Sequence, residues 1–112
     1  MSTPVETDWT RPEFKAYLLT YAAKADYIES LEEKEIIQQL VSPSEYRRIH
    51  KEIDKDNDYQ SLQKIMYNLK KFNYSKDELD KLMDDIKNLF LSDGEYDLLE
   101  QNMYHSLKRL LS

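Results

Sequence analysis

A single glycine, Gly94, serves the whole chain of 112 residues. Glycine adopts the left-handed backbone conformations of tight turns more readily than any other residue, and sheet proteins need many such turns. The chain also has only three prolines, the other common turn residue. A β-sandwich or barrel is therefore disfavoured. Long helices joined by short polar links are favoured, because such links need few special conformations.

Helix starts are marked by a repeated pattern in which Ser, Thr or Asp precedes Glu by three residues. The two side chains of such a capping box satisfy free backbone N–H groups in the first helical turn. The pattern occurs at Thr10/Glu13, Ser30/Glu33, Ser42/Glu45, Ser75/Glu78 and Asp97/Glu100, and a further start is expected at Asn57 or Asp58. Six starts predict six helices.

Apolar residues between these starts recur every three or four positions, as they do on one face of an α-helix. The clearest run is Leu79, Leu82, Met83, Ile86, Leu89 and Phe90, and a short helix is expected around Tyr46, Ile49 and Ile53. No segment alternates apolar and polar residues over the length of a strand. We predict an all-α fold, a single compact domain of about six antiparallel-packed helices over residues 10–112. Residues 1–9 are expected to form a loose tail that Trp9 pins against the body.

The charge balance limits the partners that the chain is expected to have. It carries 22 acidic and 16 basic residues, for a net charge of −6. Such a field opposes binding to nucleic acids and to anionic membranes, so we expect neither a nucleic-acid partner nor direct membrane insertion. No apolar run approaches the ~18 residues of a spanning helix, and the first ten residues lack the features of a signal peptide. These features predict a cytoplasmic location.

Residue patterns of common catalytic sites do not occur in the sequence. The chain has no cysteine, which excludes disulfides, thiolate metal sites and cysteine nucleophiles. His50 and His105 lack the spacing of a zinc-binding helix, and one glycine cannot build a phosphate-binding loop. We therefore expect that the protein is not an enzyme. Residues 54–65 begin like a calcium loop, but Tyr59 and Ile65 stand where an EF-hand has Gly and Glu, which favours a polar linker.

A short acidic pattern occurs twice in the chain. The two copies are residues 26–33 (DYIESLEE) and residues 93–100 (DGEYDLLE), and they align without a gap. Each copy follows one apolar helix and opens another, and Gly94 stands where a left-handed residue ends the helix. Asp26 and Asp93 lie at helix C-terminal ends, where the helix dipole disfavours an anion. Two explanations are open: an Asx-turn that holds backbone N–H groups, or an oxygen-ligand site for Ca²⁺ or Mg²⁺.

The segments AAKADYIESLEEKEII (22–37) and LFLSDGEYDLLEQNMYHSLKRLL (89–111) resemble the two halves of TerB-like domains, the tellurite-resistance group. The family pattern is an Ala-rich helix that ends in Ala-Asp-Gly, then a short loop and an acidic helix start. The resemblance implies an all-helical bacterial module of stress-response assemblies, with acidic residues that bind a divalent cation. The candidate ligands are Asp93, Glu95, Glu100, Asp26 and Glu33. The second copy is the stronger candidate, because Tyr27 replaces the glycine that the family has in the first.

The nine tyrosines suggest a second hypothesis. Tyr17, Tyr21, Tyr46 and Tyr59 are expected in the core with hydroxyls that reach the surface. Tyr27 and Tyr96 fall in or beside loops, where they either pack on the core or form a partner-binding patch. The alternative function is a metal-free module whose acidic surface covers a basic partner, as an immunity or inhibitor protein does. Both hypotheses expect a protein partner, and an apolar outer stripe on the fourth or sixth helix is compatible with a dimer.

Overall fold

The computed structural model describes residues 7–24, 29–92, 94, 96 and 98–111. The helices are α1 (Arg11–Ala23), α2 (Leu31–Gln38), α3 (Pro43–Lys55), α4 (Asp58–Lys71), α5 (Lys76–Leu91) and α6 (Leu98–Leu111). The described residues contain no strand, so the predicted all-α fold with six helices is confirmed. In this part of the chain, none of the helices has the length and apolar character needed to cross a membrane.

The helix starts follow the local chemistry that the sequence predicts. Complete capping boxes begin α1, α2, α3 and α5 at Thr10, Ser30, Ser42 and Ser75. Asn57 begins α4 with the same reciprocal geometry, in which Gln60 takes the place of Glu. The predicted cap Asp97 lies outside the described residues. α3 is longer than expected, with 13 residues, of which Ile49 and Ile53 alone are buried.

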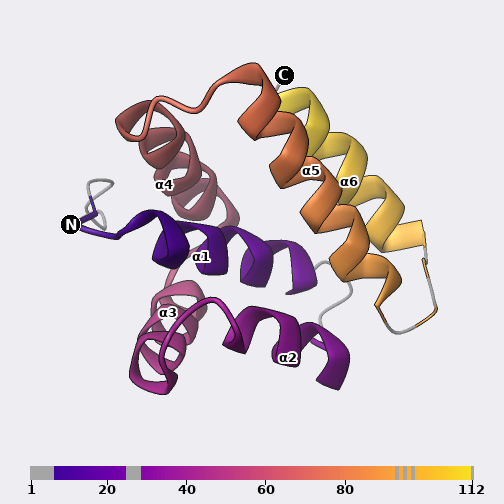
Figure 1. Ribbon diagram of the computed structural model, residues 1–112, viewed down its shortest axis with the longest axis horizontal. Coiled ribbons are helices and arrows are strands. Elements are labelled where there is room, and N and C mark those ends of the chain that lie inside the picture. Colours follow the sequence, from indigo (N-terminus) through magenta and orange to yellow (C-terminus); the bar gives the residue numbers. More distant parts are fainter. Residues whose placement is uncertain (1–6, 25–28, 93, 95, 97, 112) are drawn as a thin grey trace.

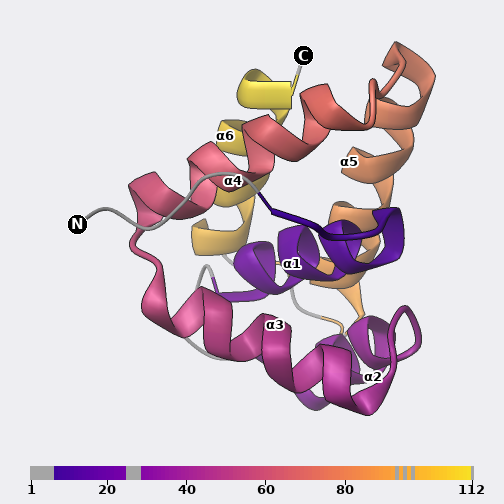
Figure 2. The same cartoon turned by 90° about the vertical axis from the view of Figure 1, so that its left-hand side faces the viewer.

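The central element is α1, which packs against each of the other five helices (Figures 1 and 2). Its apolar residues face several directions, and Phe14, Tyr17 and Leu18 are completely buried. A helix that is covered on most sides needs apolar residues around most of its circumference. The run FKAYLLTYAA meets that requirement, and it places the core around α1.

The two last helices form a hairpin, and α4 stands apart from it. α5 and α6 pack against each other, and the loop between them includes Gly94, whose φ of 82° is left-handed as predicted. α4 contacts α1, but in the described part of the chain no comparable packing joins α4 to α5 or α6. Figure 1 shows α4 above α1 and the α5–α6 hairpin to the right of α4. This arrangement leaves one flank of α4 without a neighbouring helix.

The described chain begins with a segment that packs on α1 and α4. Trp9 is 6% exposed, and its ring lies 4.5 Å from that of Tyr17. The Thr7 hydroxyl donates to the Asn68 side chain at 3.1 Å, and the Lys71 ammonium donates to the Thr7 carbonyl at 2.9 Å. Trp9 therefore contacts the body as expected, and these bonds link the segment to the outer end of α4.

Candidate functional site

The predicted cation site falls mostly on residues that the structure does not describe. Asp26, Asp93 and Glu95 lie outside the described residues. Glu33 and Glu100 are both buried, each in the first turn of its helix, and Glu33 accepts the N–H of the residue that caps α2 at 2.9 Å. Among the described residues, no group of three or more Asp, Glu, His or Cys side chains could hold a metal ion. The cation site stays a prediction.

The tyrosines predicted from the sequence differ in exposure. Tyr27 lies outside the described residues. Tyr96 is half-buried and stacks on Phe90 with ring centroids 6.3 Å apart, which is the arrangement expected of a loop aromatic that packs on its own core. Tyr59 was expected in the core but is 68% exposed. That expectation was wrong, because α4 has no neighbouring helix on the side from which Tyr59 projects.

The segment that begins like a calcium loop, residues 54–65, includes the end of α3, Asp56 and Asn57, and the first part of α4. Its three aspartates have protein partners: Lys24 for Asp54, Lys64 for Asp56 and the Tyr21 hydroxyl for Asp58. The expected polar linker is thus confined to Asp56 and Asn57, and Asn57 caps α4.

The Asp56 carboxylate pairs with the buried ammonium group of Lys64, a residue that is 1% exposed. It lies 2.8 Å from Asp56 and 2.6 Å from Glu52, and the Tyr17 hydroxyl donates to Asp56 at 2.7 Å. Burial disfavours the charged amine, but the hydrogen bonds to the two carboxylates outweigh it and raise the pKa of Lys64. The network ties α4 to α1 and to the end of α3, which is a structural role.

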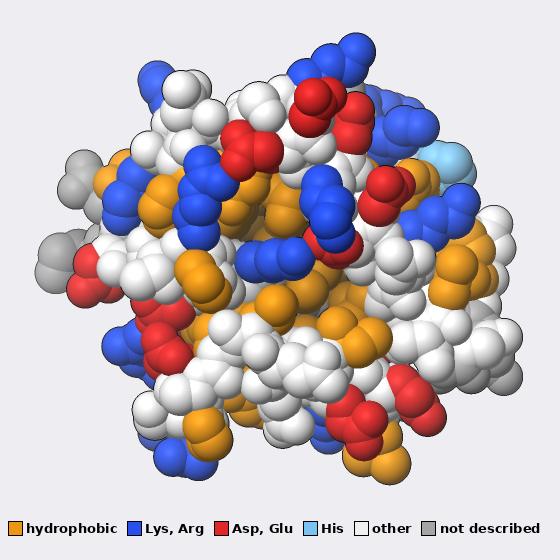
Figure 3. Space-filling view, in the orientation of Figure 1, with side chains coloured by type: hydrophobic (Ala, Val, Ile, Leu, Met, Phe, Trp, Pro, Cys, Tyr) orange, Lys and Arg blue, Asp and Glu red, His pale blue; other side chains and the backbone are white. Residues whose placement is uncertain are grey.

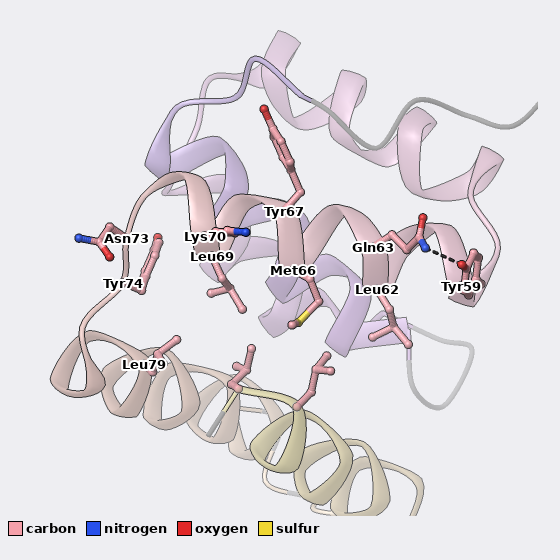
Figure 4. A pocket seen from close by; sticks show the side chains of 12 residues that line it. Tyr59, Leu62, Gln63, Met66, Tyr67, Leu69, Lys70, Asn73, Tyr74 and Leu79 are labelled. Atoms are coloured by element: carbon pink, nitrogen blue, oxygen red, sulfur yellow. Dashed lines mark hydrogen bonds between the residues drawn. The ribbon is translucent and has the colours of Figure 1, made fainter.

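A large hollow of the described surface lies between α4 and the α5–α6 hairpin. It has a volume of about 950 Å³ and is lined mainly by apolar side chains. They include Leu62, Met66 and Leu69 from α4, Leu79 from α5, and Leu110 and Leu111 from α6. Figure 4 shows the side chains of Leu62, Met66 and Leu69 pointing from α4 toward the hairpin. The hollow occupies the flank of α4 that has no neighbouring helix.

A second hollow, of about 400 Å³, continues the first along the same two helices. The two share Leu62 and Leu110, and the second extends to Leu99 and Met103 near the start of α6. We call the continuous surface formed by the two hollows the α4–α6 groove. It follows α4 from Asp58, its first residue, to the turn that leads into α5.

The α4–α6 groove is apolar and open to solvent. Tyr59, Met66 and Leu99 on its walls are 68%, 45% and 47% exposed. Lys70 and Asp58 are the only charged side chains among the residues that line it. Sequence analysis did not identify this groove, because the spacing of apolar residues shows which side chains share a face but not what covers that face.

A different kind of hollow lies between α1, the end of α2 and α5, with a volume of about 560 Å³. Ion pairs cross it: Arg11 with Glu78 at 2.5 Å, and Asp85 with both Lys15 at 2.6 Å and Lys81 at 2.7 Å. The face in Figure 3, which lies over α1 and α5, shows apolar side chains bordered by charged ones of both signs. Most of the charged residues that line this hollow take part in these ion pairs, so this surface is a weaker candidate for binding than the α4–α6 groove.

The chain matches no protein-family model, no curated protein and no solved structure. The TerB-like resemblance therefore stays a prediction, and the α4–α6 groove is the feature on which a functional proposal can rest.

Proposed function

We propose that the protein is a non-enzymatic binding module that holds a helical segment of a partner protein in the α4–α6 groove. The observation that carries this proposal is the open apolar groove, in which large side chains that could be covered remain in water. Burying such surface releases roughly 25 cal/mol per Å² of apolar area. Apolar grooves between helices are the surfaces on which amphipathic helices dock in many complexes.

This proposal agrees with the part that both sequence hypotheses share. The TerB-like module of a stress-response assembly and the immunity-type module each require a protein partner. The groove is apolar, whereas the immunity-type hypothesis relies on the acidic surface of the chain, so the proposal favours hydrophobic docking over charge neutralisation as the main source of affinity. Cation binding is a separate proposal, because Glu33 and Glu100, the candidate ligands that the structure describes, are not among the groove-lining residues.

A designed peptide tests the proposal without knowledge of the natural partner. The probe is a fluorescently labelled amphipathic helix with leucines at every third or fourth position, titrated with the protein and followed by fluorescence anisotropy. We expect the wild type to bind it. Met66→Glu should weaken binding at least about tenfold, because a carboxylate would enter an apolar interface.

Leu91→Glu is the matched control. Leu91 has the same 45% exposure as Met66, but it lies at the end of α5 and lines neither part of the groove. The control should bind the peptide as the wild type does. An absence of binding to the wild type, or equal losses in the two variants, would show that the groove does not hold a helix.

A further inference from the structure

The α4–α6 groove has two chemically different ends, because α4 and α6 run in the same direction along it. One end is formed by the residues after α4, Asn73 and Tyr74, together with Leu110 and Leu111 at the end of α6. The other end brings the first residue of α4, Asp58, together with Leu99 near the start of α6. The C-termini of both helices thus lie at one end of the groove and their N-termini at the other.

The two charged lining residues mark these ends with opposite signs. Lys70, in the last turn of α4, lines the end at the helix C-termini, and Asp58 lines the end at the N-termini. Both side chains belong to exposed residues. A docked segment therefore meets positive charge at one end and negative charge at the other.

The acidic residues at the start of α5 do not cancel this asymmetry. Asp77 and Glu78 are near the C-terminal end of α4 in the chain, but both line the other hollow, between α1 and α5. Glu78 is paired there with Arg11 at 2.5 Å. The charge of Glu78 is therefore already neutralised, and neither acidic residue is among those that line the groove.

Helices commonly carry acidic residues in the first turn and basic residues in the last, since these charges complement the helix dipole. Such a helix matches the groove in only one direction. Its acidic first turn would lie near Lys70 and its basic last turn near Asp58, so that it runs antiparallel to α4 and α6. The helix dipoles favour the same direction, because the positive end of the docked helix would lie beside the negative ends of α4 and α6.

Building on the proposed function, we infer that the occupant of the groove is an amphipathic helix of a partner protein, with an acidic first turn and a basic last turn, docked antiparallel to α4. The 14 residues of α4 set its length. At 1.5 Å per residue they span roughly 21 Å, about four turns of the docked helix. This goes beyond apolar docking, because it specifies the charge pattern and the direction of the partner.

Two peptides with the same apolar face test the direction. The first carries Glu in its first turn and Lys in its last turn, and the second carries the exchanged charges. We expect the wild type to bind the first peptide about tenfold more tightly at low salt. The preference should shrink as salt is added, because salt screens exposed charges.

The peptide with exchanged charges also forms the less stable helix by itself, which would weaken its binding in either direction. A variant of the protein with swapped groove charges therefore provides the control. Lys70→Glu/Asp58→Lys should reverse the preference between the same two peptides, since their own helicities do not change. Circular dichroism of the variant confirms that it is folded. The milder variant Lys70→Met should lose part of the preference without reversing it.

The possible outcomes distinguish the inferred direction of the docked helix from the proposal that a helix docks in the groove at all. A preference that the variants leave unchanged would overturn the inferred direction while binding to the groove stands. Failure of both peptides to bind the wild type would overturn the proposed function as well. Sedimentation of the protein without peptide tests whether a second copy of the chain occupies the groove. A dimer that Met66→Glu dissociates would show that it does, and would overturn the inference of a different partner.

Discussion

Replacement of the buried Lys64 by methionine would remove the ammonium group of the ion-pair network that holds α4 against α1 and α3. Methionine has a similar length and can fill the same space without an ammonium group. Asp56, whose side chain is 0% exposed, would then lose its cationic partner but keep the hydrogen bond from Tyr17. Glu52 is less affected, because 28% of its side chain is exposed and can be hydrated.

The expected loss follows from the cost of an uncompensated buried charge. Removal of one partner of a buried ion pair typically costs about 3–5 kcal/mol, because the remaining charge has neither water nor a counterion. The Tyr17 hydrogen bond offsets part of this, so we expect Lys64→Met to lower the free energy of unfolding by about 3 kcal/mol. The second variant Asp56→Asn, combined with Lys64→Met, should recover part of the loss by removing the charge that was left unpaired.

Urea unfolding can be followed through Trp9, the only tryptophan, which is buried against Tyr17. The exposed Lys51 provides a control, because Lys51→Met should change the free energy of unfolding by no more than about 0.5 kcal/mol. A loss below about 1 kcal/mol in Lys64→Met would refute the reasoning. So would a double variant whose loss is the sum of the two single losses, because the pair would then be uncoupled.

Three more predictions address other parts of the chain. The hydrogen bond from Arg11 lowers the pKa of Glu78 to about 2, from 4.5. Its stabilisation is therefore present above pH ~4.5 and lost as the pH falls toward 2, so urea unfolding of Glu78→Gln should depend less on acid pH than that of the wild type; equal dependence would contradict this. Gly94→Ala should cost about 1 kcal/mol in urea unfolding, because φ is 82° and the space around a new Cβ is open, so backbone strain alone acts. A wild-type midpoint in Gly94→Ala would be inconsistent with that strain. If the predicted cation site exists, millimolar Ca²⁺ or Mg²⁺ should raise the thermal midpoint of the wild type but not of Asp93→Ala; no shift in the wild type would remove the site from consideration.

The helix starts could be predicted from the sequence because capping is local chemistry. Thr10 and Glu13 lie three residues apart, and their mutual hydrogen bonds depend on little beyond the first helical turn. The same holds for Gly94, where the left-handed conformation is a property of one residue and its neighbours. By contrast, sequence analysis expected a short α3, because only the apolar residues of that helix were used to judge its length.

The candidate site could not be predicted in the same way. The spacing of Leu62, Met66 and Leu69 places them on one face of a helix, but it does not show what covers that face. The tertiary structure packs α4 on α1 and leaves this face beside the α5–α6 hairpin as an open groove. Tyr59 is exposed for the same reason.

The sequence by itself therefore determined the all-helical class, the helix starts and the left-handed turn at Gly94. Each of these depends on residues close together in the chain. Only the tertiary structure decided which apolar faces are covered, which charges are buried and where a groove remains. Those properties depend on how helices distant in sequence pack around α1, because burial belongs to a contact between two surfaces and not to either surface alone.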